Sequence, residues 1–465
     1  MAIKIDIDPE IFREYDIRGI TNTNLTTDVV YWIGRAFATE AHIEGCSEIV
    51  TGRDGRISSP SIEESLTRGL IDGGCNVVTI GQVTTPMLYY AATKIGNGTA
   101  IMITGSHNPP AYNGLKMMLD GTTLSGTRIQ NLKNKINGGN LSIGKGSLTQ
   151  NSISADYANE ISRQGHTTRK LKVVIDCGNG VAGDSAPELI KNIGCEVTEL
   201  YCTVDGSFPN HHPDPADPIN LQELVKAVID SGSDIGLAFD GDGDRLGVVT
   251  NKGTIIWPDK LMMLFAKHIL SENPGTTIIS DVKCSRDLEA TVQEAGGQYI
   301  MWKTGHSHIK AKMKETNSLL GGEFSGHICF SDQWYGFDDA TYSAARLLKI
   351  VAKSNQTAEA IFAEFPNKWC TPEIKIETTE SKKFEIIELL KTSSSFPAGK
   401  KTTLDGIRID YEDSWGLIRA SNTSPVLSLR FEAEDPQGLM KIQEQFKKNL
   451  FKVAPELKFP LFEPS

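Results

Sequence analysis

The chain has 465 residues, of which 39% are hydrophobic and 23% charged, and a formal net charge of −11. A chain of this length is expected to form three or four domains. The acidic balance without a basic tract argues against nucleic-acid binding. The sequence has no apolar run of about 18 residues and no signal-peptide pattern, so we expect no membrane segment. Eight scattered cysteines without a Cys-x-x-Cys pair fit free thiols in a reducing cytoplasm.

Short apolar runs of strand character alternate with segments of helical periodicity, the pattern of α/β layers. Predicted strands lie at 48–51, 77–80, 100–104, 172–176, 235–239, 277–281 and 299–302. Three predicted helices, at 62–72, 186–193 and 285–295, each lead through a glycine into a returning strand. This repeated helix-glycine-strand pattern is modest evidence for three related α/β domains.

Linker-like segments divide the chain. A Gly-, Ser- and Asn-rich stretch covers 137–154, a turn with a proline covers 251–259, and the strand pattern changes after 365–372. We therefore predict α/β domains at 1–150, 151–254 and 255–366, and a smaller C-terminal α+β domain at 367–465.

The first motif with chemical content is the segment Thr104-Gly105-Ser106-His107-Asn108-Pro109, at the end of a predicted strand. Ser106 is expected on a tight loop at the carboxyl end of that strand, where ligands bind in α/β folds. Asn108 rules out the Gly-x-Ser-x-Gly elbow of serine hydrolases. A serine that accepts and donates a phosphoryl group fits better, although an ordinary turn or capping serine explains this motif alone equally well.

The second motif alternates aspartate with glycine, Asp240-Gly241-Asp242-Gly243-Asp244-Arg245, between two apolar runs. Three carboxylates so close together repel one another unless a cation lies among them, and oxygen-only ligands suit Mg²⁺ first. An EF-hand is excluded because its sixth and twelfth positions are Arg245 and Asn251. The less favoured alternative is a turn of solvated aspartates.

The third motif is Gly321-Gly322-Glu323-Phe324-Ser325-Gly326-His327. In an extended loop Glu323, Ser325 and His327 would face one way. A carboxylate and a hydroxyl bracketed by glycines suit the neighbouring hydroxyls of a sugar. Read alone, a polar loop with a structural acid stays an alternative.

The fourth motif is Arg419-Ala420-Ser421-Asn422-Thr423-Ser424-Pro425, in the predicted last domain. A guanidinium, hydroxyls, an amide and turn N–H groups can bind a phosphate. Arg430, one strand further on, is a candidate for a second positive charge there. An exposed turn with a solvated arginine is the equally weighted alternative.

Together the four motifs resemble, in order and spacing, the α-D-phosphohexomutase family, and the resemblance extends from the segment 13–19 to near the C-terminus. Within that family the chain is similar to the bacterial phosphomannomutase/phosphoglucomutase group. The resemblance implies four domains around a central cleft, three of them with a related mixed α/β topology. It also implies an enzyme that interconverts hexose 1-phosphate and hexose 6-phosphate, of mannose and glucose, through a phosphoserine and a hexose 1,6-bisphosphate that also serves as activator.

The resemblance further assigns roles to individual residues. The implied catalytic residues are Ser106, His107, Lys116, Arg245 and His306. The implied Mg²⁺ ligands are phosphorylated Ser106, Asp240, Asp242 and Asp244. The implied substrate-binding residues are Tyr15, Arg18, Lys283, Glu323, Ser325, His327, Arg419, Ser421, Asn422 and Thr423.

Several alternatives stay open at this point. Within the family they are a phosphoglucosamine mutase and a sugar-bisphosphate synthase that releases its intermediate. Outside it they are a metal-dependent phosphatase and a non-catalytic sugar-phosphate-binding protein. The expected partners are small sugar phosphates, with no nucleic acid and no membrane, and we expect a monomer in the cytoplasm.

Overall fold

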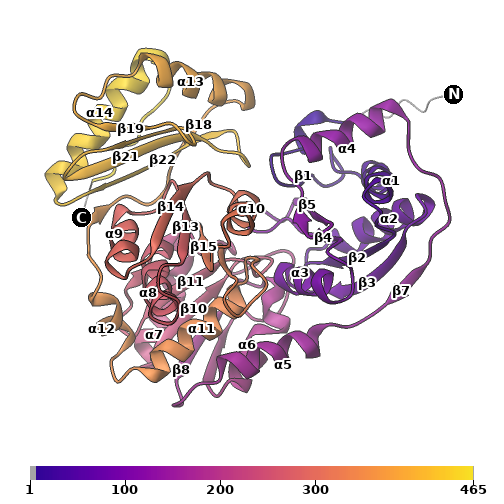
Figure 1. The fold of residues 1–465 in the computed structure, drawn as a ribbon, viewed down its shortest axis with the longest axis horizontal. Coiled ribbons are helices and arrows are strands. Elements are labelled where there is room, and N and C mark those ends of the chain that lie inside the picture. The colour runs from indigo at the N-terminus through magenta and orange to yellow at the C-terminus, as the bar shows by residue number, and fades with distance from the viewer. Residues whose placement is uncertain (1–6, 464–465) are drawn as a thin grey trace.

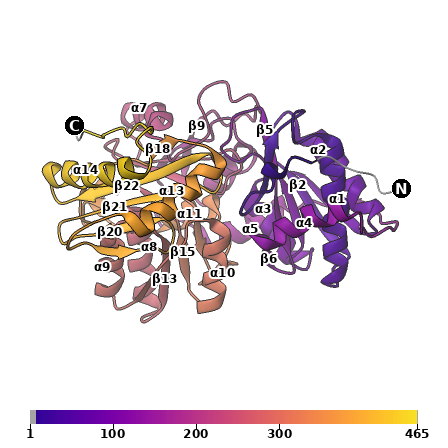
Figure 2. The ribbon, with the colours of Figure 1, turned by 90° about the horizontal axis from the view of Figure 1, so that it is seen from above.

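The computed structural model describes residues 7–463, which contain four β-sheets (Figure 1). We call the units built on these sheets domains I to IV in chain order. In the views of Figures 1 and 2 domain I, indigo and purple, forms one lobe, and domain IV, yellow, lies on the other side of the molecule. This four-domain α/β architecture confirms the predicted fold class. The exact domain boundaries stay a prediction, and residues 1–6 and 464–465 lie outside the described part.

Domain I has a seven-stranded sheet in the order β1-β5-β4-β2-β3-β7, with β6 paired to β5. After a short 3-10 helix at Pro9–Ile11, its elements are β1 (Ile17–Ile20), α1 (Thr27–Ile43), β2 (Glu48–Arg53), α2 (Ser59–Asp72), β3 (Asn76–Gln82), α3 (Thr85–Lys94), β4 (Ala100–Ile103), β5 (Tyr112–Leu119), β6 (Thr122–Thr123), α4 (Thr127–Gly138) and β7 (Leu148–Gln150).

Domain II has a five-stranded sheet in the order β12-β11-β10-β8-β9. Its elements are α5 (Ser154–Gly165), β8 (Lys172–Asp176), a 3-10 helix at Val181–Asp184, α6 (Ala186–Asn192), β9 (Glu196–Leu200), η3 (Pro218–Leu221), α7 (Gln222–Ser231), β10 (Ile235–Phe239), β11 (Leu246–Thr250) and β12 (Ile255–Ile256).

Domain III has a four-stranded sheet in the order β14-β13-β15-β16. Its elements are α8 (Pro258–Glu272), β13 (Thr277–Asp281), α9 (Arg286–Glu294), β14 (Gln298–Trp302), α10 (His306–Thr316), β15 (Leu320–Gly322), β16 (Ile328–Phe330), α11 (Ala340–Lys353) and α12 (Ala358–Ala363).

Domain IV has an antiparallel sheet in the order β17-β22-β21-β20-β19, with β18 paired to β22. Its elements are β17 (Trp369–Cys370), β18 (Ile374–Glu377), α13 (Glu380–Ser393), β19 (Lys400–Thr402), β20 (Ile407–Asp410), β21 (Ser414–Ala420), β22 (Val426–Ala433) and α14 (Pro436–Val453). None of the helices among residues 7–463 is long and apolar enough to cross a membrane.

Domains I, II and III repeat one topology. In each, a central strand pairs in parallel with the next strand on one side and with a third strand on the other, and that third strand pairs antiparallel with a fourth. The four strands are β2 to β5 in domain I, β8 to β11 in domain II and β13 to β16 in domain III. The predicted helix-glycine-strand pattern corresponds to α2–β3, α6–β9 and α9–β14, so the predicted repeat is confirmed.

Local sequence explains where several helices begin. Thr26 and Thr84 accept hydrogen bonds from the backbone N–H groups of Val29 and Met87 and so cap the starts of α1 and α3. Asp435 caps α14 in the same way, and Pro436 follows at the first helical position, where its missing N–H costs nothing.

Domain IV joins domain III through buried arginines rather than through the main core. One apolar core runs through domains I, II and III, whereas domain IV has its own. Arg408 donates hydrogen bonds of 2.8 Å to the carbonyls of Val282 and Cys284 and lies 3.9 Å from the Trp415 ring centroid. Arg430 pairs with Asp259 of α8 at 2.9 Å. Arg430 is therefore buried between the domains, and its predicted place in a phosphate site is wrong.

We predict that Arg408→Met loosens domain IV. The substitution leaves two buried carbonyls without their donor, which costs about 1–3 kcal/mol. Hydrogen exchange of β20 and β21 should speed up, while exchange in α1 should not change. The matched control is Arg128→Met, because Arg128 forms an ion pair with Glu44 that is about one-third exposed. Unchanged exchange in domain IV of Arg408→Met would show that the guanidinium does not hold the interface.

Candidate active site

The first three motifs occupy equivalent loops of the repeated topology. Ser106 follows β4, the acidic segment follows β10, and the Glu323 segment follows β15, so each loop joins the third strand to the fourth. The fourth motif joins β21 to β22 of domain IV. The loops meet at one cavity of about 640 Å³. The predicted residues that line it are Tyr15, Arg18, Ser106, His107, Lys116, Arg245, Lys283, His306, Glu323, Ser325, His327, Arg419, Ser421, Asn422 and Thr423.

Ser106 faces the acidic loop, although 134 residues separate the two in sequence. Its hydroxyl donates a hydrogen bond of 3.1 Å to Oδ2 of Asp240 and lies 3.2 Å from Nδ1 of His107. Ser106 has a backbone φ of +49°, a left-handed conformation that is uncommon for serine. The loop must therefore be held by its surroundings.

Arg56, which no sequence motif indicated, binds the backbone of the Ser106 loop. Its guanidinium donates to the carbonyls of Ser106 (2.7 Å), Asn108 (2.6 Å), Pro109 (2.8 Å) and Tyr112 (3.0 Å), and its Nε donates to Asp54 (3.2 Å). The side chain is fully buried and does not line the cavity. It also explains Gly105, because a Cβ there would lie 2.5 Å from the guanidinium.

The three aspartates of the second motif are completely buried and lie beneath the cavity beside Lys116. Nζ of Lys116 donates to Oδ2 of Asp242 at 2.7 Å and to Oδ2 of Asp244 at 2.5 Å. Asp240 accepts from the backbone N–H groups of Asp244 and Arg245 at 3.0 and 3.1 Å. The loop needs a glycine at 243, where φ is +75°.

This loop fits a metal ion. Within the described chain, Oδ1 of Asp242 and Oδ1 of Asp244 accept no hydrogen bond, and the carboxylates of Asp240, Asp242 and Asp244 lie within 4.8 Å of one another. Burial and the two neighbouring carboxylates raise the pKa of Asp240 well above its ordinary value. Crowded negative charge with free carboxylate oxygens is what a hard divalent cation relieves. The acidic cluster can therefore hold a metal.

The third motif is a tight turn rather than the extended loop that alternation predicted. The backbone N–H of Glu323 donates to the carbonyl of His327, and that of Gly326 donates to the carbonyl of Glu323. Glu323, Ser325 and His327 nevertheless all line the cavity, because the turn as a whole points into it. Oε1 of Glu323 accepts from the backbone of Gly305 at 2.6 Å, and burial raises the pKa of this carboxyl group.

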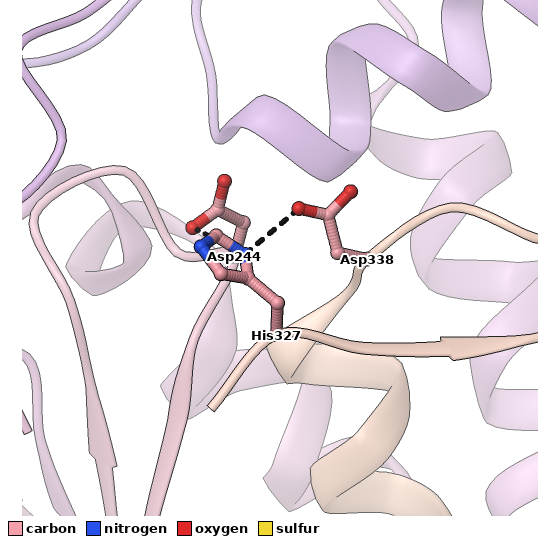
Figure 3. A group of neighbouring side chains, drawn as sticks. All are labelled: Asp244, His327 and Asp338. Atoms are coloured by element: carbon pink, nitrogen blue, oxygen red, sulfur yellow. Dashed lines mark ion pairs between the residues drawn. The ribbon is translucent and has the colours of Figure 1, made fainter. Parts of the chain in front are cut away.

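His327 connects the second and third motifs. Nε of Arg245 donates to its Nε2 at 2.9 Å, and its Nδ1 lies 2.8 Å from Oδ2 of Asp338 and 3.5 Å from Oδ1 of Asp244 (Figure 3). The ring of His306 stacks on the ring of His327 with centroids 5.2 Å apart. Burial and the charge of Lys310 lower the pKa of His306 well below its ordinary value. His306 is therefore neutral near pH 7.

The fourth motif lines one wall of the cavity with hydrogen-bond donors. Nε of Arg419 donates to Asp405 at 3.0 Å, whereas its buried Nη2 has no partner among residues 7–463. The Oγ of Ser421 accepts from the backbone of Thr423 and Ser424, and Asn422 donates to the hydroxyl of Tyr15. A buried guanidinium with a free donor beside hydroxyl groups suits a phosphate.

Other residues on this cavity were not predicted. Among them are Asp16, Asn108, His212, Asp214, Glu373 and Lys375. His212 and Asp214 come from the long connection between β9 and η3, where Asp214 lies 3.8 Å from Nη1 of Arg245. The polar cluster His211-His212-Pro213-Asp214 was a visible signal, because a long segment without helix or strand inside a domain is often functional.

Four family models match consecutive parts of the chain. They are the phosphoglucomutase/phosphomannomutase domain I (residues 9–141), domain II (155–253), domain III (257–369) and C-terminal domain (373–449). The chain belongs to the phosphoglucomutase/phosphomannomutase family. The predicted family is therefore confirmed, as is the predicted enzyme class, a hexose phosphate mutase of the phosphotransferase type.

Relatives match over nearly the whole length. The phosphomannomutase/phosphoglucomutase of Pseudomonas putida is 51% identical over 97% of both chains, and the phosphoglucomutase of Neisseria gonorrhoeae is 48% identical over 97% of this chain and 99% of its own. A solved phosphoglucomutase/phosphomannomutase family protein from Burkholderia thailandensis has a TM-score of 0.92, with 44% identity over 98% of this chain and 100% of its own.

We predict that Arg56→Lys lowers turnover by about 10–100-fold while KM stays within about threefold, because a small displacement of a reacting group costs that much. A lysine keeps the positive charge but cannot donate to four carbonyls at once. Steady-state kinetics with glucose 1-phosphate measure the effect. The matched control is Arg53→Lys, since Arg53 at the end of β2 pairs with Glu63 and not with the serine loop. A normal kcat in Arg56→Lys would refute the positioning role.

Proposed function

We propose that this phosphohexomutase interconverts the 1-phosphates and 6-phosphates of mannose and glucose through phosphorylated Ser106 and a hexose 1,6-bisphosphate. The observation that carries the proposal is the hydrogen bond between the Ser106 hydroxyl and Asp240, at the wall of a cavity that also contains the free donor of Arg419. A phosphoryl donor and a second phosphate site then face the same sugar.

Ser106 would carry the transferable phosphoryl group. Its bond from phosphorus to Oγ breaks while a bond forms from phosphorus to the free sugar hydroxyl, whose proton leaves to a nearby base. Asp240, Asp242, Asp244 and an oxygen of phosphorylated Ser106 would hold Mg²⁺. The ion supplies neutralising charge to the transferring phosphoryl group.

The cations and histidines around Ser106 divide the remaining work. Burial disfavours a charged Lys116, but Asp242 and Asp244 outweigh it and raise the pKa of its ammonium. Lys116 thus stays protonated and stabilises phosphoryl charge together with Arg245. His306 is neutral and suits proton transfer, and His107, beside Ser106, would orient the serine oxygen.

The substrate-binding residues must serve two orientations of the bisphosphate. Arg419, Ser421, Asn422 and Thr423 would bind the phosphate that is not reacting, with Tyr15, Arg18 and Lys283 around the sugar. Glu323, Ser325 and His327 would contact ring hydroxyls such as the 3- and 4-hydroxyls, which keep their place when the sugar turns end for end. If no residue of the site contacts the hydroxyl at C2, glucose and mannose, which differ only at that carbon, are both substrates.

The proposal includes action as a monomer on small sugar phosphates. We expect those substrates, and hence the enzyme, in the cytoplasm. The hexose 1,6-bisphosphate would also act as activator, because it restores the phosphate on Ser106 whenever the intermediate escapes.

Ser106→Ala is expected to abolish turnover, because the variant lacks the proposed phosphoryl carrier, yet to bind substrate with an affinity within about tenfold of wild type. Calorimetric titration with glucose 1-phosphate measures binding, and intact-protein mass spectrometry of the wild type should find one phosphate on Ser106. Turnover of Ser106→Ala at the wild-type rate would reject the covalent scheme. Phosphate found on the wild-type protein solely at a residue other than Ser106 would reject it too.

Arg419→Ala is expected to raise KM for glucose 1-phosphate by about 10–100-fold with a smaller effect on kcat, because a buried charged hydrogen bond to phosphate is lost. The matched control is Arg286→Ala, since Arg286 of α9 does not line the cavity and pairs with Glu434 of domain IV. An unaltered KM in Arg419→Ala would remove the fourth motif from the substrate site.

Mannose 1-phosphate and glucose 1-phosphate are expected to differ in kcat/KM by less than about a thousandfold, roughly 4 kcal/mol. Glucosamine 6-phosphate tests the alternative mutase, and a chain named probable phosphoglucosamine mutase, from Methanosarcina barkeri, is 33% identical. A coupled assay with all three substrates distinguishes these activities. Preference for glucosamine 6-phosphate would overturn the proposed specificity, and free bisphosphate as the main product would indicate the synthase.

A further inference from the structure

Asp338 lies beside His327 (Figure 3) and within ion-pair distance of His306, but it does not itself line the cavity. It comes from the connection between β16 and α11, and a backbone bridge to Cys329 fixes its position. The side chain is fully buried. A buried carboxylate is costly unless its charge is compensated, so its partners indicate what it does.

The two oxygens of Asp338 have different partners. Oδ1 accepts a hydrogen bond of 2.8 Å from Nζ of Lys310 on α10. Oδ2 lies 2.8 Å from Nδ1 of His327 and 3.5 Å from Nδ1 of His306. Burial disfavours the charged form, but the charge of Lys310 lowers the pKa of Asp338 well below its ordinary range. Asp338 is therefore a fixed negative charge between one lysine and two imidazoles.

The contact with Arg245 defines which nitrogen of His327 carries the proton. A guanidinium N–H can only donate, so Nε2 of His327, 2.9 Å from Nε of Arg245, must accept. A neutral imidazole has one N–H, which is then on Nδ1, and the nearest carboxylate oxygen is Oδ2 of Asp338, at ion-pair distance but without hydrogen-bond alignment. Asp244, 3.5 Å away, is the more distant carboxylate and also belongs to the acidic loop.

We infer that Asp338 is a positioning residue for His327 and His306. It keeps the Nδ1 proton and the ring of His327 in place, so that Nε2 stays the acceptor for Nε of Arg245, and the stacked ring of His306 is held with it. The inference rests on the proposed function in one respect, namely that these histidines act on the sugar phosphate. Loss of the negative charge of Asp338 should leave the residues that line the cavity in place but allow the imidazole rings of His327 and His306 to reorient.

The next residue provides a matched control. Asp339 is almost as buried as Asp338, but its carboxylate accepts from the hydroxyl of Tyr157 at 2.9 Å, from the Trp334 indole at 3.2 Å and from the backbone of Tyr342 at 2.9 Å. These contacts connect α11 to α5, and none involves a residue of the cavity. A general effect of replacing a buried aspartate would therefore appear in both variants.

Asp338→Asn is expected to lower kcat by about 10–100-fold with KM within about threefold, whereas Asp339→Asn keeps kcat within about threefold. In a His327→Gln background the further effect of Asp338→Asn should shrink below about threefold, because two residues that act through one another are not additive. Equal losses from Asp338→Asn in both backgrounds, or a loss no larger than that of Asp339→Asn, would overturn the inference.

A second measurement does not depend on catalysis. In protein labelled with ¹⁵N-histidine, the His327 resonances, assigned with His327→Gln, should report a proton on Nδ1 in the wild type and a changed tautomer balance in Asp338→Asn. The same spectrum in both would overturn the inference even if the proposed function holds. Absence of mutase turnover in the wild type would refute the proposed function alone.

If Asp338→Asn does not fold, Lys310→Gln tests the same link through the other oxygen. This variant removes the group that fixes Oδ1 and is expected to change the His327 tautomer balance and to lower kcat by about threefold or more. Wild-type kcat together with a wild-type histidine spectrum in Lys310→Gln would overturn the inference.

Discussion

The close approach of Ser106 to three buried aspartates is the constraint on which the rest of the site depends. A hydroxyl at 3.1 Å from Asp240 cannot carry a phosphate there unless positive charge compensates both groups. Lys116 and Arg245 supply part of that charge, and the free carboxylate oxygens leave room for a divalent cation. The same compensation explains how a chain of net charge −11 admits an anionic substrate, because the local cations act against the field of the whole protein.

The repeated topology makes this approach possible. Domains I, II and III place their active loops between the third and fourth strands of the same arrangement, so that three copies of one structural position meet at one cavity. In the proposed mechanism the repeat gives one loop for the nucleophile, one for the metal and one for the sugar. Domain IV differs in both topology and attachment, because its core is separate and two buried arginines connect it to domain III.

The sequence predicted the parts of the site that depend on local chemistry. The acidic loop, the serine loop, the sugar loop and the fourth motif all lie where strands end, and strand ends were readable from apolar runs. Arg56 and Asp338 were not predictable in this way, because their roles come from carbonyls and imidazoles that only the folded chain brings beside them. The extended form of the Glu323 loop was wrong because backbone hydrogen bonds within the segment close a turn, and Arg430 was misplaced because Asp259 binds it between domains.

The transfer of one phosphoryl group between Ser106 and the sugar is the central claim, and an isotope experiment tests it most directly. Enzyme carrying ³²P on Ser106 is mixed with unlabelled glucose 1-phosphate for a single turnover, and product and protein are separated. The label is expected in glucose 6-phosphate, while the original phosphate of the substrate stays on Ser106. Label that remains on the protein during product formation, or that is released as inorganic phosphate, would contradict it.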